Sequence, residues 1–107
     1  MDIEQIMELI LHAGNSESAS LMSIEAAREF NFEEAMAQNE IARQELKEAH
    51  NEQTAFLQRQ ALGDHIEMDI YMTHAQDHFA MASVLKNFSD EMINVYKLIQ
   101  ELKEERK

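Results

Sequence analysis

Two histidines one helical turn apart are the side chains in this sequence best suited to chemistry. His74 and His78 are separated by four positions, so they lie on the same face of a helix. An imidazole is nucleophilic near neutral pH, and a group bound to it can be passed on to a second acceptor. Phosphoryl transfer of this kind needs an accessible ring nitrogen on His74. It also needs hydrogen-bond donors for the phosphoryl oxygens, which Gln76 and His78 could supply.

The same pair allows two other interpretations. Histidines at positions i and i+4 are a common pair of zinc ligands, and Asp77 is a neighbouring candidate. The sequence contains no cysteine, however, so further ligands for such a site would have to come from elsewhere. The two histidines could also be ordinary surface or core residues with no chemistry. The spacing alone leaves all three interpretations open.

The elements that position these side chains are expected to be long helices. The 107 residues include no proline and two glycines, and Ala, Glu, Gln, Met, Leu and Lys dominate. All six are good helix formers. The sequence therefore predicts an all-α, antiparallel three-helix bundle in a single domain. The helices are expected over residues 2–29, from Asn31 to about Arg59, and from Asp69 to near Glu104.

The ends of these helices have recognisable signals. Asn31 followed by Glu34 predicts a capping box, in which each side chain binds the other residue's backbone N–H. Gly63 is expected to end the second helix in the left-handed conformation, and Asp69 to cap the third. The first helix is expected to run through Gly14 without a break. The predicted inner side of the second helix comprises Ala35, Met36, Ala42, Leu46, Ala49, Phe56 and Leu57.

The third predicted helix carries two lines of mostly apolar residues. One alternates steps of three and four, as in a coiled-coil seam. A helix with two apolar faces needs two sets of partners. The first two helices can cover one face, and copies of the same chain can cover the other, so we expect a homo-oligomer. The seam contains Ile70, Thr73, Asp77, Ala80, Met81, Val84, Phe88, Met92, Val95 and Ile99; the second line contains Tyr71, Ala75, Ala82, Leu85 and Tyr96.

Asp77 is the charged member of this seam. A buried carboxylate is costly unless it is paired or coordinated. If copies meet at the seam, several like charges converge and need a cation, a proton or a basic neighbour. Alternatively, Asp77 lies at the edge of the seam in contact with water, or pairs with Lys86 or a nearby histidine.

The overall charge excludes several classes of function. A net charge of −12 argues against binding to nucleic acid or to an anionic membrane surface, both of which would repel the chain. No apolar run approaches the length of a membrane span, and the first residues lack the basic start of a signal peptide. We therefore expect a cytoplasmic protein with a protein partner.

Three segments of the chain match a known pattern. Residues 73–81 (THAQDHFAM) resemble the H-[AG]-Q-D-H-L-M signature of the lactose/cellobiose-type IIA component of the sugar phosphotransferase system (PTS). Residues 48–54 (EAHNEQT) are similar to that family's E-A-H-x-x-Q-T, and residues 13–15 (AGN) to its A-G-D/N segment. The resemblance covers essentially the whole chain in order and spacing. One departure is Glu17, which stands where the family typically has arginine.

The resemblance implies a specific activity for one IIA-type domain over residues 1–107. His74 would accept phosphate from the carrier protein HPr and pass it to a cysteine of the IIB component, which makes the chain a phosphotransferase component. Gln76 and His78 would line the groove around the phosphorylated ring. The chain would form a homotrimer through its third helix. Asp77 would face the trimer axis and bind a metal ion there, magnesium being the expected one.

The resemblance also implies that the chain does not bind the membrane directly, and it does not identify the sugar. Contact with the membrane would be indirect, through the IIC component. Lactose, cellobiose and chitobiose systems share this signature.

His50, in the second motif, is expected to be a core or interface histidine, with a direct role at the site as the alternative. The competing functional hypothesis is a non-catalytic acidic helical scaffold or regulatory oligomer.

Overall fold

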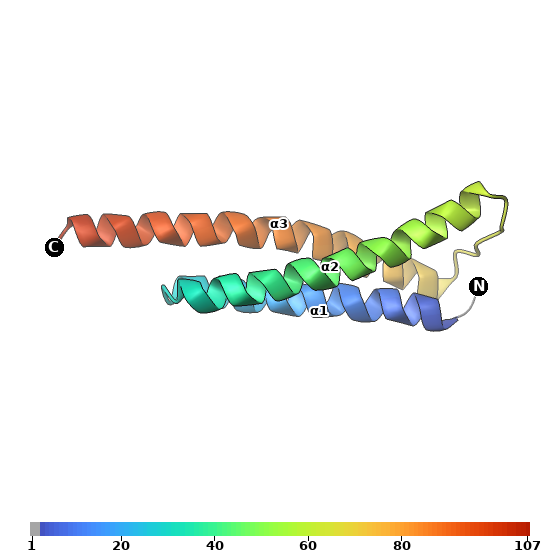
Figure 1. The fold of residues 1–107 in the computed structure, drawn as a ribbon, viewed down its shortest axis with the longest axis horizontal. Helices are drawn as coiled ribbons and strands as arrows, with labels where there is room; N and C mark the ends of the chain where they lie inside the picture. The colour runs from blue at the N-terminus through green and yellow to red at the C-terminus, as the bar shows by residue number, and fades with distance from the viewer. Residues whose placement is uncertain (1–2) are drawn as a thin grey trace.

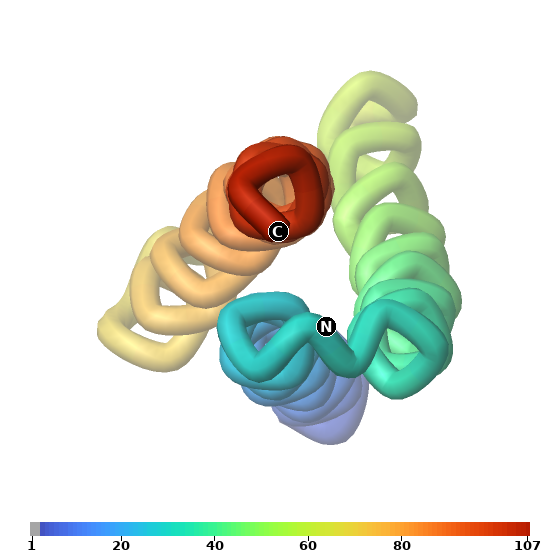
Figure 2. Tube along the Cα trace, turned by 90° about the vertical axis from the view of Figure 1, so that its left-hand side faces the viewer, coloured from blue at the N-terminus to red at the C-terminus, as the bar shows by residue number. Residues whose placement is uncertain are grey.

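The computed structural model describes residues 3–107, which form three helices. These are α1 (Ile3–Arg28), α2 (Phe32–Ala61) and α3 (Ile70–Glu105), and no strand occurs among the described residues. α1 and α3 run in one direction along the molecule and α2 in the other (Figure 1). Seen end on, the three helices form a triangle (Figure 2). The predicted all-α three-helix architecture is confirmed.

α1 is one continuous helix through Gly14, as predicted; residue 2 of the expected helix lies outside the described part. The face of α1 that packs in the bundle consists largely of small side chains. Ser16 donates a hydrogen bond to the Ala42 carbonyl (2.8 Å) and Ser23 to the Ala35 carbonyl (2.7 Å), both in α2. Small residues allow two helix backbones to approach closely. The buried residues of α1 are Ile6, Leu9, Ala13, Ser16, Ala19, Ser20, Ser23 and Ala27.

The inner side of α2 follows a strict repeat of seven. Its buried residues are Ala35, Ala42, Ala49 and Phe56. The expectation that Met36 and Leu57 also lie inside is wrong, because their side chains are 51% and 60% exposed. The spacing of seven keeps one narrow line of α2 in contact with its neighbours, so the adjacent positions turn outward.

The turn between α1 and α2 contains half of the predicted capping box. The Asn31 side chain accepts a hydrogen bond from the Glu34 N–H (3.2 Å), as expected. The reciprocal bond is absent: the Asn31 N–H donates to the Ala26 carbonyl (2.9 Å), and the Glu34 carboxylate accepts from Gln38 (2.9 Å). The left-handed conformation of Phe30 (φ 61°) brings the Asn31 N–H back to α1, and this explains the difference.

The connection from α2 to α3 begins and ends at the predicted residues. Gly63 has φ 102°, a left-handed conformation that glycine adopts without steric cost. The Asp69 side chain accepts a hydrogen bond from the Met72 N–H (2.9 Å) and so caps α3. The first residue of α3, four positions before His74, is therefore fixed by a local contact.

α3 has two distinct faces. Its buried residues, which pack with α1 and α2 in the core, are Met72, Ala75, Ala82, Lys86, Ser89 and Ile93. The opposite line, called here the outward stripe, is exposed and comprises Ile70, Asp77, Met81, Val84, Phe88, Val95, Ile99 and Leu102. α3 also continues beyond the α1–α2 turn (Figure 1). The described residues of this chain leave the outward stripe uncovered.

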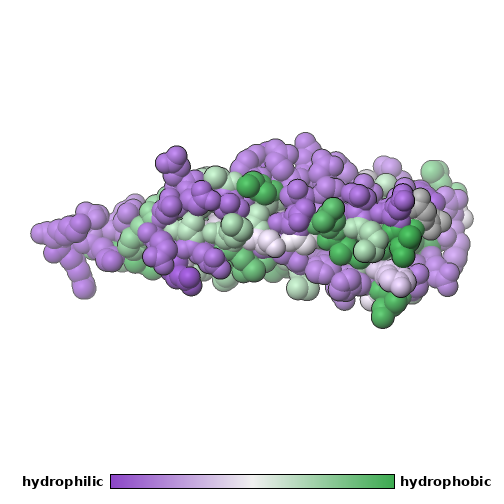
Figure 3. Space-filling view, turned by 90° about the horizontal axis from the view of Figure 1, so that it is seen from below, coloured by the Kyte–Doolittle hydropathy of each residue, from purple (hydrophilic) through white to green (hydrophobic). Residues whose placement is uncertain are grey.

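Hydrophobic side chains also reach the surface on the α1 side, where they form patches among hydrophilic atoms (Figure 3). The large exposed ones of α1 are Ile3, Met7, Leu11, Leu21 and Met22. None of the described helices has the length and apolar character needed to cross a membrane.

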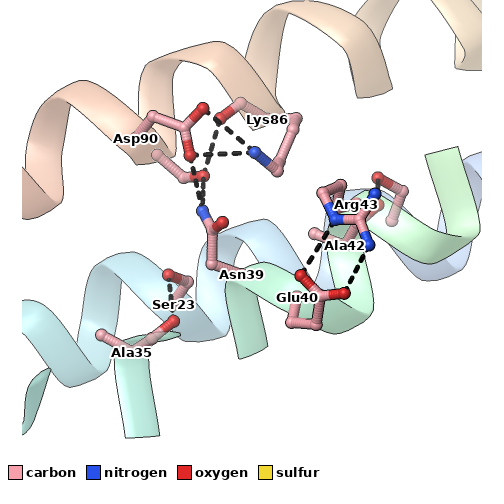
Figure 4. Close-up of polar contacts among 10 residues, drawn as sticks. Ser23, Ala35, Asn39, Glu40, Ala42, Arg43, Lys86 and Asp90 are labelled. Atoms are coloured by element: carbon pink, nitrogen blue, oxygen red, sulfur yellow. Dashed lines mark hydrogen bonds and ion pairs between the residues drawn. The ribbon is translucent and has the colours of Figure 1, made fainter. Parts of the chain in front are cut away.

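A polar cluster joins α2 to α3 at the buried face (Figure 4). Lys86 Nζ, whose side chain is only 11% exposed, donates to both carboxylate oxygens of Asp90 at 2.9 and 3.0 Å. Asn39 of α2 donates to Asp90 (2.8 Å) and to the Ser89 hydroxyl (3.2 Å). Because these bonds are directional, they define how α3 sits on α2.

Candidate functional site

His74 and His78 lie on one face of α3, in its second and third turns. Their imidazole rings meet edge to face, with ring centroids 4.5 Å apart. His74 is exposed, whereas His78 is half-buried. The two histidines therefore lie on one helix face, as their spacing predicts, and the ring of His74 is open to an approaching molecule.

His78 is tied to α1 through Glu17. Its Nδ1 lies 3.0 Å from Oε2 of Glu17, and the Glu17 side chain is only 14% exposed. Because a carboxylate oxygen can only accept, this contact is a hydrogen bond in the form of His78 that carries its hydrogen on Nδ1. Sequence reasoning noted Glu17 as a departure from the family pattern but did not place it at the site. The two residues are 61 positions apart, and no local pattern links them.

Gln76 takes a different direction from His74. Two residues correspond to a rotation of about 200° around a helix. The Gln76 amide donates to Oε1 of Gln53 in α2 (2.7 Å) and approaches Sδ of Met72 (3.4 Å). Within one chain, the structure therefore brings His78 to His74 and places Gln76 between α3 and α2.

Asp77 is exposed on the outward stripe. Lys86, one of the alternative partners considered for Asp77, binds Asp90 on the opposite face of α3 instead. Part of the stripe forms one wall of an open apolar groove of about 610 Å³ between α1 and α3. The groove is lined by Glu17, Leu21, Ala80, Met81, Val84, Leu85 and Phe88.

A metal site within one chain would need several carboxylate or imidazole groups close together. Among residues 3–107, no three His, Asp or Glu side chains come together in a way that could hold a metal ion. A zinc site built from His74, His78 and Asp77 of one chain is therefore not supported. Asp77 supplies oxygen atoms of the kind that magnesium prefers, but one chain provides a single carboxylate. The donor set fits a hard cation only where copies of Asp77 meet.

His50, in α2, lies on the surface beside α3. Its ring is exposed and 6.1 Å from that of Phe79, centroid to centroid. No described contact joins His50 to His74. The expectation that His50 lies in the core is wrong, because its side chain is exposed, and its role at an interface stays a prediction.

A contact between a histidine and a carboxylate, which the sequence did not indicate, connects α1 to α2. His12 Nδ1 donates to Glu45 (2.6 Å), and its Nε2 lies 3.4 Å from Glu8. The hydrogen bond to Glu45 raises the pKa of His12 above its usual value, while partial burial opposes the change. The contact with Glu45 therefore favours the charged form of His12 and links α1 to α2.

An exposed ion pair on α2 has a separate electrostatic effect. The Arg43 guanidinium beside Glu40 lowers the pKa of that carboxyl to about 2 (Figure 4). This pair lies on the solvent side of α2 and does not contribute to the site.

Comparisons with known proteins agree on one family. Residues 4–97 match the family model described as "PTS system, Lactose/Cellobiose specific IIA subunit". The "Lichenan-specific phosphotransferase enzyme IIA component" of Bacillus subtilis is 40% identical, over 94% of this chain and 92% of that protein. The "PTS system cellobiose-specific EIIA component" of Lactococcus lactis is 34% identical, over 91% of this chain and 84% of that protein.

A solved structure gives the same result for the fold. The crystal structure of the "PTS Cellobiose Specific Enzyme IIA" from Bacillus anthracis superimposes with a TM-score of 0.90. It is 32% identical in sequence, and the match covers 94% of both chains.

Proposed function

Because this chain belongs to the lactose/cellobiose-specific IIA family of the sugar phosphotransferase system, we propose that His74 is the residue that carries the phosphoryl group. The protein is a component of phosphotransferase-driven uptake of lactose-, cellobiose- or lichenan-type sugars. Membership implies two protein partners, the phosphate donor HPr and the acceptor IIB.

The observation that carries the proposal is the exposure of the His74 ring together with its edge contact to His78. A carrier must present its nucleophile to two different proteins, so an exposed ring on a rigid helix suits the task. The second histidine provides a polar neighbour for the phosphoryl oxygens. The remaining three histidines lack this arrangement. His12 is engaged by Glu45, the ring of His50 faces Phe79, and His65 lies in the connection before α3.

The proposed reaction exchanges one bond to phosphorus for another. The lone pair of a His74 ring nitrogen attacks phosphorus as the phosphorus–nitrogen bond to the HPr histidine breaks, and that electron pair returns to the donor ring. In the second step a cysteine sulfur of IIB attacks, and His74 recovers its lone pair. The chain's contribution is to orient His74 and to supply hydrogen-bond donors, because little other bond-making is required. Gln76 becomes a donor to the phosphoryl group only if its bond to Gln53 opens.

The proposal includes a homotrimer formed through α3. The outward stripe carries Met81, Val84 and Phe88 at 58%, 70% and 55% exposure, spaced as a coiled-coil seam. Isolated large apolar side chains at a surface are ordinary, but a continuous stripe of them marks an interface. Around a three-fold axis, one side of the stripe packs against the other side of a neighbour's stripe, so copies of the same chain can cover it.

We extend the proposal to a cation at the trimer axis. Three Asp77 carboxylates would converge there and repel one another unless a positive charge lies between them. Carboxylate oxygens suit magnesium, which keeps several bound waters in such sites. This ion would stabilise the assembly and take no part in the transfer. The whole assembly would work in the cytoplasm and reach the membrane through IIB and IIC.

The test is an intact-mass assay with phosphoenolpyruvate, enzyme I and HPr. Wild type is expected to gain one acid-labile phosphoryl group, and His74→Ala to gain none. His65→Ala provides a matched control, because His65 is an exposed histidine in the connection before α3. Phosphorylation of His74→Ala would move the acceptor to another residue. No phosphorylation of wild type by an HPr that phosphorylates a known IIA protein would favour the scaffold hypothesis.

A further inference from the structure

Glu17, His78 and His74 form a continuous line of contacts from α1 to the exposed ring on α3. Glu17 Oε2 lies 3.0 Å from Nδ1 of His78, and the ring of His78 meets that of His74 edge to face. Exposure increases along the line: the side chain of Glu17 is 14% exposed and that of His78 26%. A half-buried acidic group is therefore connected to the surface histidine through one intermediate ring.

The surroundings of Glu17 suggest that this contact does more than fill space. Among the residues that the structure describes, the other carboxylate oxygen, Oε1, is buried and has no hydrogen-bond partner. Leaving a buried carboxylate oxygen unpaired is costly, and native proteins rarely do so without a reason. Glu17 also borders the apolar groove between α1 and α3, where a hydrophobic side chain would be favourable. His78 is the only partner described for this carboxylate.

We propose that Glu17 is a positioning residue that orients the His74 ring for phosphoryl transfer by holding His78 in one orientation. The inference rests on the proposed role of His74 as acceptor. Glu17 does not touch the phosphoryl group, and no bond to it forms or breaks.

The physical basis is a restriction of ring rotation. An exposed histidine on a helix populates more than one rotamer, and only some of these point a ring nitrogen toward a partner. The hydrogen bond from Nδ1 to Glu17 fixes both the rotamer of His78 and the position of its hydrogen. The fixed ring of His78 then limits the positions that the His74 ring can take. Orienting a nucleophile in advance lowers the entropic part of the barrier to transfer.

The experiment compares two substitutions at position 17. Glu17→Leu removes the acceptor atom, whereas Glu17→Gln removes the charge but keeps a carbonyl oxygen that can accept from Nδ1. Phosphoryl transfer from phospho-HPr is measured at steady state. We expect Glu17→Leu to lower kcat by about 10-fold with little change in KM. Glu17→Gln should recover most of the wild-type kcat, and Glu25→Leu, on the exposed side of α1, should behave as wild type.

Two kinetic results would overturn the proposal. Equal losses in Glu17→Leu and Glu17→Gln would show that the charge, and not the hydrogen bond, matters. An increase in KM alone would make Glu17 part of a docking surface for HPr.

A second measurement is independent of phosphorylation and of the variants' folding. Nitrogen-15 NMR of the histidine rings in wild type should show His78 with its hydrogen on Nδ1. A spectrum with the hydrogen on Nε2 alone would refute the positioning role, even if His74 is the acceptor. Conversely, a His78 ring with its hydrogen on Nδ1 in a chain that accepts no phosphate would refute the proposed function and keep the contact.

Discussion

The imidazole ring of His78 meets the ring of His74 edge to face, with ring centroids 4.5 Å apart. This relationship arises because residues four apart in a helix lie above one another. It places a polar, half-buried ring directly beside an exposed one. The surroundings of His74 within the chain therefore depend on α3 itself and, through His78, on α1.

The first prediction concerns His78. His78→Ala should slow phosphoryl transfer to His74 by about 10- to 100-fold, because an orienting ring and a hydrogen-bond donor are both lost. Rapid-quench measurement of phosphate transfer from phospho-HPr would give the rate, and intact mass should still show one phosphoryl group at the end point. A wild-type rate would mean that His78 is a bystander.

The second prediction concerns Asp77 and assembly. Asp77→Leu should strengthen self-association, since it removes converging like charges and continues the apolar stripe beside Met81 and Val84. Sedimentation velocity over a dilution series would show the oligomer persisting at lower concentration, with no response to magnesium. Phosphate acceptance should stay unchanged. A variant that sediments as wild type does would place Asp77 away from the contact between copies.

The third prediction concerns the close packing of α1 against α2. Ser23→Ala should cost about 1 kcal/mol, because one buried hydrogen bond to the Ala35 carbonyl is lost. Ser23→Leu should lower the free energy of unfolding by about 1–3 kcal/mol, because the extra carbon atoms force the helices apart. Urea unfolding at one fixed protein concentration measures both. Ser18→Leu is the control on the exposed side of α1, with an expected change within about 0.5 kcal/mol.

The fourth prediction concerns the buried lysine of α3. Asp90→Ala should destabilise the fold by about 1–3 kcal/mol, because Lys86 is left charged and without its partner in a largely dry position. The effect is smaller than for a fully buried pair, since Asp90 is 46% exposed. Adding Lys86→Met should recover part of the loss. Purely additive effects in this double-mutant cycle would argue against a specific pair.

The fifth prediction concerns pH and His12. Its pKa is raised in the folded chain, chiefly by the hydrogen bond to Glu45. A raised folded-state pKa stabilises the fold fully below the unfolded value of about 6.5, and this contribution is lost as pH rises through the folded pKa. His12→Gln should therefore be less stable than wild type at pH 6, and the difference should shrink toward pH 9. Partial exposure limits the difference to less than about 1 kcal/mol. Thermal unfolding of both proteins across this range is the measurement, and a constant difference would exclude the ion pair as its source.

Much of the fold could be predicted because its signals are local. Asp69, Asn31 and Gly63 act within a few residues of their own position, and the structure confirms the helix ends they predict. Spacing predicted the seam of α3 that the structure leaves exposed. The second predicted line is partly wrong, because among its five residues only Ala75 and Ala82 are buried and Tyr71 is 51% exposed. The trimer, the metal at Asp77 and the acceptor role of His74 stay predictions.

The packing of α1 and the partner of His78 could not be predicted in the same way. Periodicity analysis follows large apolar residues, whereas Ser16 and Ser23 are buried because their hydroxyls bind α2 carbonyls. The contact between Glu17 and His78 depends on how α1 and α3 are rotated against each other. That rotation is set by the packing of many small side chains, and no single pattern in the sequence specifies it.

The polar cluster of Lys86, Asp90 and Asn39 has a consequence for a residue that it does not touch. A helix is a rigid screw, so a slip of α3 by one position against α2 would turn every side chain on it by about 100°. His74 lies 12 positions before Lys86, or about 18 Å along the axis. The directional bonds of the cluster fix the rotation of α3 and therefore the side of the bundle toward which the distant imidazole points. Contacts about three helical turns along α3 from His74 thus determine the direction in which this chain presents His74 to its partners.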